Sequence, residues 1–242
     1  MLLPDLEGKS CCALVMDTES QLWSRRHPEL CRGGANPLLD TAVFQTMVDE
    51  VHREHAVDWS YGGYLEDRRY ILRGTYLEAT GNFLHLGVDM NVPYGTRVAA
   101  TFPASVMLVD DDQDQDGGWG PRVFLKPEGP DAPSVVFIYA HLENPRCKPG
   151  DVLLPGTVFA TVGGPPHNGN WFPHLHVQAI REQLFRQILL QRFQELDGYG
   201  PPAARARLED DFPDPLPYLG IPQHPGLTHM PEPLPAFRRR PR

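Results

Sequence analysis

The chain has 242 residues, a formal net charge of −9, and 41% hydrophobic residues. This length suits one large domain or one domain with appendages, and the apolar fraction is enough for a packed core. The acidic balance argues against a nucleic-acid partner, because no basic stripe is present to neutralise phosphates. No apolar run reaches the roughly 18–20 residues that a membrane span needs.

The first residues of the sequence, 1–9, carry acidic side chains and no basic or apolar leader. A cytoplasmic location is therefore expected, with a secreted or periplasmic location open if a leader precedes these residues. The cysteines form no CxxC pair, so reduced thiols are expected, and a bridge from Cys11 or Cys12 to Cys31 stays open. The fourth cysteine is Cys147.

The first section of the chain, residues 1–75, is expected to be an arm and a helix that pack on the main domain. Proline and glycine breakers favour irregular structure over residues 1–37. A helix is predicted at about 38–56, because apolar residues recur there every four positions and Asp40 or Asn36 can cap it. His52 and His55 lie on that helix without a third ligand nearby, which favours a solvated helix face over a metal site.

Three tyrosines, Tyr61, Tyr64 and Tyr70, stand among charged residues in the segment 58–74. We expect them to pack this segment onto the main domain. Lining one wall of a substrate cleft is the alternative, since aromatic side chains also line ligand clefts.

From residue 76 to 182 the sequence consists of short segments of β-branched or aromatic residues, separated by Gly, Pro and Asp. Such segments, without helices between them, predict an antiparallel sheet core, so the fold class is mainly β and α+β overall. The expected strands are Phe83–Met90, Thr96–Ala100, Ser105–Val109, Arg122–Leu125, Ser134–His141, Val158–Val162 and His174–Ile180.

The last section, residues 183–242, is expected to hold a C-terminal helix and a tail. An apolar stripe predicts the helix from Arg181 to Leu196, ended by Asp197-Gly198. The remainder is so rich in proline that we expect an extended tail.

One acidic stretch matches the start of a calcium loop, with Asp112, Asp114 and Asp116 in a DxDxDG pattern. The twelfth position is Val123 rather than a bidentate glutamate, and no flanking helices are expected. A solvated hairpin loop is therefore favoured over a calcium site.

The residues with the clearest chemistry are histidines near strand ends. His174 and His176 share one face of an extended segment, as do His85 and Asp89, and His141 ends an apolar strand. Imidazole and carboxylate groups are good zinc ligands, and a hydrolytic zinc site needs three of them plus a water. Gly87, between His85 and Asp89, permits close backbone approach.

These segments, His85-x-x-x-Asp89, Tyr139-Ala140-His141-Leu142 and His174-Leu175-His176, resemble the three signatures of the lysostaphin/LytM-type zinc metallo-endopeptidases. The resemblance covers roughly residues 76–180. It implies that His85, Asp89 and His176 bind one zinc ion. It also implies that His141 and His174 lie beside the metal, and that one of them acts as the general base.

The implied function is hydrolysis of an amide bond in a peptide or a peptidoglycan-like substrate through a zinc-activated water. Two alternatives stay open: a cytosolic zinc hydrolase or lyase acting on a small amide or peptide metabolite, and a catalytically silent binding protein of the same fold. The loop before His174 departs from the family pattern and places Asn170, Trp171 and Phe172 at the expected substrate groove. The sequence does not indicate the oligomeric state.

Overall fold

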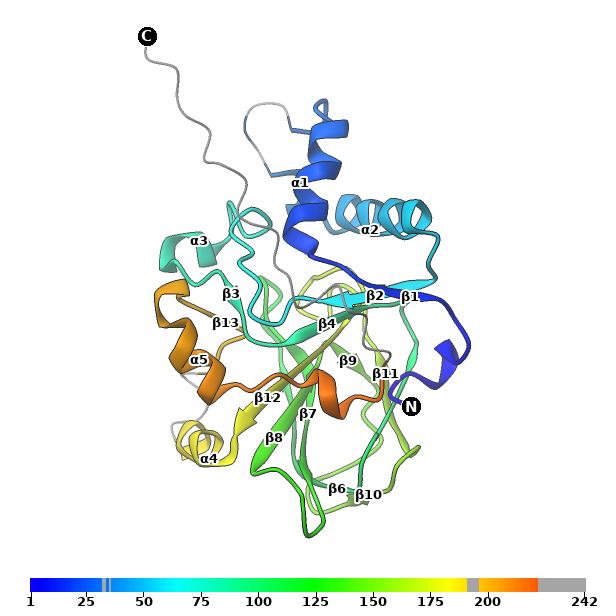
Figure 1. Ribbon diagram of the computed structural model, residues 1–242, viewed down its shortest axis with the longest axis vertical. Helices are drawn as coiled ribbons and strands as arrows, with labels where there is room; N and C mark the ends of the chain where they lie inside the picture. The colour runs from blue at the N-terminus through cyan, green and yellow to red at the C-terminus, as the bar shows by residue number, and fades with distance from the viewer. Residues whose placement is uncertain (32–33, 35, 191–195, 222–242) are drawn as a thin grey trace.

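The computed structural model describes residues 1–31, 34, 36–190 and 196–221 (Figure 1). Its centre is an eight-stranded sheet with the order β1-β2-β4-β12-β8-β7-β6-β10. All neighbouring strands in it are antiparallel except β1 and β2, so the predicted antiparallel core is confirmed. These strands are β1 (Cys11–Ala13), β2 (Trp59–Gly62), β4 (Val88–Asn91), β6 (Ala104–Asp112), β7 (Gly120–Pro127), β8 (Val135–Ala140), β10 (Val152–Leu153) and β12 (Leu175–Arg181).

Two smaller sheets complete the strands of the described residues. A three-stranded antiparallel sheet has the order β5-β11-β9, and a two-stranded one pairs β13 with β3. Their strands are β3 (Leu84–His85), β5 (Arg97–Ala99), β9 (Leu142–Glu143), β11 (Val158–Val162) and β13 (Tyr199–Gly200).

Side chains alternate between the two faces of the large sheet, as the period of a strand requires. On β12, Leu175 and Val177 join the main apolar core, which also contains residues of the three-stranded sheet. His176 and Gln178 point to the opposite face, together with Ile180, which joins a second apolar cluster. We call this opposite face the site face.

Helices cover the site face at its two ends (Figure 1). Helices α1 and α2 lie against each other at one end, and α4 and α5 contact β12 at the other. The helices are α1 (Met16–Arg26), α2 (Thr41–His55), α3 (Tyr76–Thr80), α4 (Glu182–Leu190) and α5 (Arg205–Asp211).

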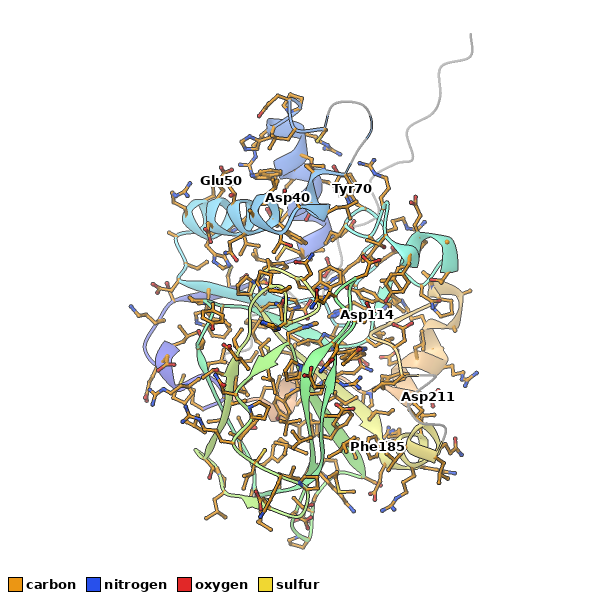
Figure 2. The ribbon with its side chains drawn as sticks, turned by 180° about the vertical axis from the view of Figure 1, so that it is seen from behind. Asp40, Glu50, Tyr70, Asp114, Phe185 and Asp211 are labelled. Atoms are coloured by element: carbon orange, nitrogen blue, oxygen red, sulfur yellow. The ribbon has the colours of Figure 1, made fainter. Side chains whose placement is uncertain are left out.

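Helix α2 confirms the helix predicted at about 38–56. Its N-cap is Asp40, whose carboxylate accepts hydrogen bonds from the backbone N–H groups of Ala42 and Val43 (Figure 2). An aspartate at this position satisfies N–H groups that have no partner within the helix. Helix α4 confirms the beginning of the predicted C-terminal helix, and residues 191–195 lie outside the described part of the chain.

Two expectations about irregular segments are wrong. Residues 1–37 contain β1 and the eleven-residue helix α1, which buries polar Asp17, Ser20 and Ser24 beside Met16 and Trp23 and so shows no apolar stripe. Residues 198–221 are not an extended tail, because they form β13 and α5. Proline is tolerated at the first position of a helical segment, and Pro202 begins the short 3-10 helix Pro202–Ala204. The rest of the predicted tail, 222–242, lies outside the described residues.

The four cysteines are free thiols, as the sequence favoured. Within the described ranges, the helices are too short or too polar to cross a membrane.

Helix α4 is held on the sheet by Phe185, which is 1% exposed and lies 5.6 Å, centroid to centroid, from Phe124 on β7 (Figure 2). We predict that Phe185→Ala lowers the free energy of unfolding by about 3–5 kcal/mol, because it leaves a cavity in the apolar cluster. Chemical denaturation measures this change. Leu190→Ala, at an 85% exposed position of the same helix, is the control and is expected to change the value by less than about 0.5 kcal/mol.

Candidate metal centre

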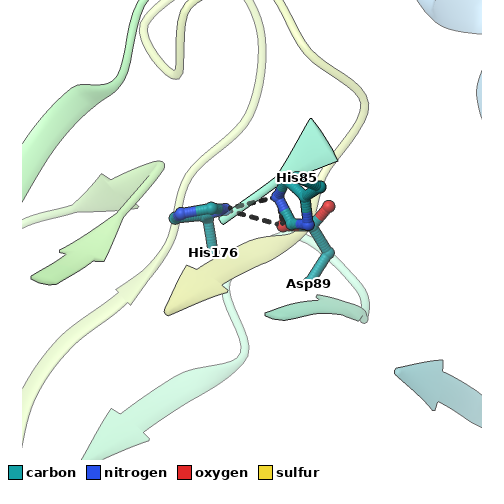
Figure 3. Close-up of side chains that lie close together, drawn as sticks. All are labelled: His85, Asp89 and His176. Atoms are coloured by element: carbon teal, nitrogen blue, oxygen red, sulfur yellow. Dashed lines mark hydrogen bonds and ion pairs between the residues drawn. The ribbon is translucent and has the colours of Figure 1, made fainter. Parts of the chain in front are cut away.

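Strand pairing brings three predicted metal ligands together on the site face. The register of β12 with β4 sets His176 directly opposite Asp89, and His85 ends the nearby strand β3 (Figure 3). His176 Nδ1 lies 2.9 Å from Asp89 Oδ1 and 3.1 Å from His85 Nε2. The distance from His85 Nε2 to Asp89 Oδ1 is 3.5 Å. All three side chains are buried.

Gly87 makes this approach possible, as the sequence indicated. A Cβ atom at position 87 would lie 2.5 Å from Cε1 of His176, well inside van der Waals contact. Any side chain there would displace the imidazole.

The hydrogen bonds around His85 fix which ring nitrogen carries the proton. His85 Nδ1 lies 3.0 Å from the carbonyl oxygen of Gly63, which can only accept. Nδ1 therefore carries the hydrogen, and the lone pair of Nε2 faces Asp89 and His176.

The tautomer of His176 is fixed by a longer chain of hydrogen bonds. The carbonyl of Asp197 accepts from Nε2 of Gln178 at 3.2 Å, which turns Gln178 Oε1 toward His176. His176 Nε2 lies 3.2 Å from that oxygen and therefore donates to it. This leaves the lone pair of Nδ1 facing the other two residues.

The two oxygens of the Asp89 carboxylate have different partners. Oδ2 accepts a hydrogen bond from Arg68 Nη1, whereas Oδ1 faces the two imidazoles. Burial alone would raise the pKa of Asp89, but His85 and Arg68 outweigh it and hold that pKa well below its usual value. Arg68 is itself buried and pairs with Glu66 as well. Asp89 is thus an anion with one free oxygen.

The three ligand atoms fit a tetrahedral zinc ion. Zinc binds nitrogen and oxygen at about 2.0–2.2 Å, which separates neighbouring tetrahedral ligands by roughly 3.3 Å. The separations of 2.9, 3.1 and 3.5 Å bracket that value. Three lone pairs directed at one point repel one another, and a cation removes this repulsion. Carbonyl and amide partners that orient the far side of each imidazole are also typical of metal-binding histidines.

His141 and His174 line the same cavity. Each ring donates from Nδ1 to a backbone carbonyl, His141 to Asn168 at 2.9 Å and His174 to Phe172 at 2.8 Å. Each Nε2 therefore keeps its lone pair. Burial lowers the pKa of His174 and holds that of His141 well below its usual value, so both rings are neutral at pH 7.

The residues of the loop before His174 differ in their burial and in the cavity that they line. Trp171 is partly buried and lines the cavity, as does Phe172. Phe172 is only 5% exposed, packs on Phe44 of α2 and stacks on the ring of His174 with centroids 4.7 Å apart. Asn170 is exposed and lies in the neighbouring cavity instead. The substrate roles of these residues stay predictions.

The cavity over the ligands is small and covered. Its volume is about 50 Å³, and its walls include Met16, Phe44 and Ile71 from the first section of the chain. A second cavity of about 230 Å³ shares Phe44, Ile71 and Trp171 with it. The segment 58–74 thus contributes cavity wall through Arg68 and Ile71, while Tyr61 is packed in the core.

Sequence reasoning missed the residues that hold the ligands in place: Gly63, Arg68, Gln178 and Asp197. Gly63, Arg68 and Asp197 lie far from the histidine motifs in sequence, so spacing carried no signal for them. Spacing did carry a signal for Gln178, because it shares a strand face with His176 two residues away.

The acidic stretch Asp112–Asp116 forms the turn between β6 and β7. Asp112 accepts hydrogen bonds from the backbone N–H groups of Asp114 and Trp119, and Asp114 accepts one from Asp116. These carboxylates therefore cap the turn.

Three comparisons relate the chain to known proteins. Residues 83–186 match Peptidase family M23. No curated protein matches the chain. Solved structures that match include a zinc-containing peptidase from Vibrio cholerae at 23% identity and a TM-score of 0.34, and LytU at 23% and 0.35. Lysostaphin from Staphylococcus simulans matches at 20% and 0.40.

Each of these matches covers only part of this chain and part of the other protein. The match covers 41% of this chain and 28% of the Vibrio cholerae peptidase, 41% and 63% for LytU, and 63% and 51% for lysostaphin. Likeness at these levels carries no information on activity. The family match spans all five predicted site residues, His85, Asp89, His141, His174 and His176. Residues 83–186 of this chain are thus similar to a peptidase M23 domain.

Proposed function

We propose that this protein is a zinc-dependent metallopeptidase that hydrolyses an amide bond. The observation that carries the proposal is the convergence of three lone pairs, on His85 Nε2, His176 Nδ1 and Asp89 Oδ1, each directed by a fixed hydrogen-bond partner. Zinc bound by these atoms would polarise the scissile carbonyl and lower the pKa of a bound water toward about 7.

The chain's own residues would manage the proton. His141 and His174 are neutral, with a free Nε2 lone pair on each, so either ring can accept a proton from the attacking water. Their backbone acceptors then bind the Nδ1–H of the resulting cation more strongly, which stabilises the charge. The same ring can afterwards return the proton to the leaving amine.

The natural substrate is the second part of the proposal. Peptidoglycan-like peptides are one class. A small amide or a short peptide is the other, and one observation favours it: the ligand residues are 1–6% exposed and line a small cavity whose walls include Met16, Phe44 and Ile71. A long polymer needs a groove open at both ends, whereas a small molecule needs only an entrance.

Substitution of the ligands tests the metal. Wild-type protein is expected to bind about one zinc ion per chain, and His85→Ala or His176→Ala to lose it, because two ligands do not hold zinc tightly. His141→Ala and His174→Ala are expected to keep most of the zinc and lose turnover. Metal analysis and hydrolysis assays measure both. Wild-type protein without zinc uptake, or equal zinc loss in all four variants, contradicts this assignment.

Gly87→Ala tests the close approach. The added methyl group displaces the imidazole of His176, so zinc affinity is expected to fall at least tenfold, as for other disturbed metal sites. Competition with a chromogenic chelator measures it. Gly156→Ala is the control, since that glycine has a φ of +88° and open space around it. The control is expected to lower stability and leave zinc affinity unchanged.

Arg68→Met tests the support of Asp89. Loss of the guanidinium removes the partner of Oδ2 and leaves Glu66 without its buried counter-ion, so zinc affinity is expected to fall about 10- to 100-fold. Arg69→Met is the matched control, because Arg69 is exposed and pairs with Asp67. Equal zinc affinity for the Arg68 variant and wild type, measured by competition, would refute a role for Arg68 in the centre.

A hydrolysis screen by mass spectrometry separates the substrate classes. It covers peptidoglycan fragments, glycine- and D-amino-acid-containing peptides, and small amides. Turnover of small amides alone supports the small-substrate proposal, and turnover of the peptidoglycan fragments overturns it.

A further inference from the structure

One buried acceptor at the metal centre has no partner. Among the described residues, six buried side-chain nitrogen or oxygen atoms lack a hydrogen bond: Ser24 Oγ, Trp59 Nε1, Arg73 Nε, Asn91 Oδ1, Tyr139 OH and Asn168 Oδ1. Of these residues, Asn91 alone lines the cavity that holds the metal ligands. Asn91 is 3% exposed, so bulk water does not satisfy its carbonyl.

The register of the sheet places Asn91 beside the reacting groups. Leu175 pairs with Met90 and His176 with Asp89. Asn91 follows Met90 on β4 and His174 precedes Leu175, and both residues line the cavity that holds the metal ligands. Asp89 and Asn91 are two residues apart on β4 and share the site face, about 6.6 Å apart along the strand. Asn91 therefore lies two residues from a ligand and lines the same cavity as a candidate general base.

Hydrogen bonds on the other side of the amide fix its orientation. Asn91 Nδ2 donates to Ser60 Oγ at 2.9 Å, and the Ser60 hydroxyl lies 2.8 Å from His52 Nε2. The sequence placed His52 on a solvated helix face, which is wrong: its ring is partly buried against β2. Burial lowers the pKa of His52, and because Asn91 Nδ2 donates to Ser60 Oγ, the serine hydroxyl is left to donate to Nε2 of the His52 tautomer that carries its hydrogen on Nδ1. The serine can then only accept from Asn91, which keeps Oδ1 turned away from it.

We propose that Asn91 Oδ1 accepts a hydrogen bond from an N–H group of the substrate next to the scissile carbonyl. A buried carbonyl without a partner costs about 1–3 kcal/mol, and a ligand donor removes that cost. A neutral acceptor selects an amide or amine N–H and rejects a carboxylate or a carbonyl at the same place. The inference rests on the proposed zinc-dependent function and adds the polarity of the substrate at one position.

Two hydroxamates test this preference without knowledge of the natural substrate. Acetohydroxamic acid chelates zinc through its oxygens and carries an N–H group beside the carbonyl. N-methylacetohydroxamic acid chelates in the same way and has no N–H group. Isothermal titration calorimetry on the zinc-loaded full chain measures the dissociation constant of each. Wild-type protein is expected to bind acetohydroxamic acid at least tenfold more tightly.

Two variants identify Asn91 as the source of that preference. Asn91→Leu keeps the branched shape of the side chain and loses the acceptor, so the ratio of the two dissociation constants is expected to fall toward one. Asn91→Asp keeps an oxygen acceptor and is expected to retain the preference. Zinc content and melting temperature, measured on each variant, verify that the fold and the metal site are intact.

The outcomes separate this inference from the proposed function. Wild-type protein that takes up no zinc overturns both. Wild-type protein that takes up zinc but does not distinguish the two hydroxamates overturns only the inference, as does a preference that survives in Asn91→Leu.

Discussion

The antiparallel register between β4 and β12 is the constraint on which the candidate site depends. It sets His176 opposite Asp89, and His174 and Asn91, two residues away along each chain, line the same cavity. A shift of one residue would turn all four side chains to the other face, among Val88, Met90 and the rest of the main core. The apolar residues that alternate with the polar ones fix that register. The register that packs the apolar core on one face of the sheet therefore also places the site residues on the other face.

Charge at the site is arranged in an alternating series. Glu66, Arg68 and Asp89 follow one another as anion, cation and anion, all buried. Burial raises the pKa of Glu66 and would raise that of Asp89, but the Arg68 guanidinium paired with Asp89 holds that pKa well below its usual value. Such a series is stable only while complete, since removal of one member leaves a buried charge uncompensated.

The sequence predicted the sheet and the histidine cluster because both follow from local pattern. Period-two alternation located the strands, and parity along them put His174 with His176 and His85 with Asp89. Helix α1 escaped prediction because its buried side chains include Asp17, Ser20 and Ser24. Arg68 and Gly63 escaped for another reason: their roles come from tertiary contacts with residues about twenty positions away, which no spacing rule describes. Phe172, predicted at a substrate groove, lines the cavity, and its ring also contacts Phe44 of α2 and stacks on His174.

The orienting partners of the two imidazoles come from both sides of the segment that matches Peptidase family M23. Gly63 precedes residues 83–186 and Asp197 follows them. Residues 83–186 alone therefore lack one orienting partner for each imidazole. A fragment cut to those bounds would not reproduce the hydrogen bonds that set both tautomers.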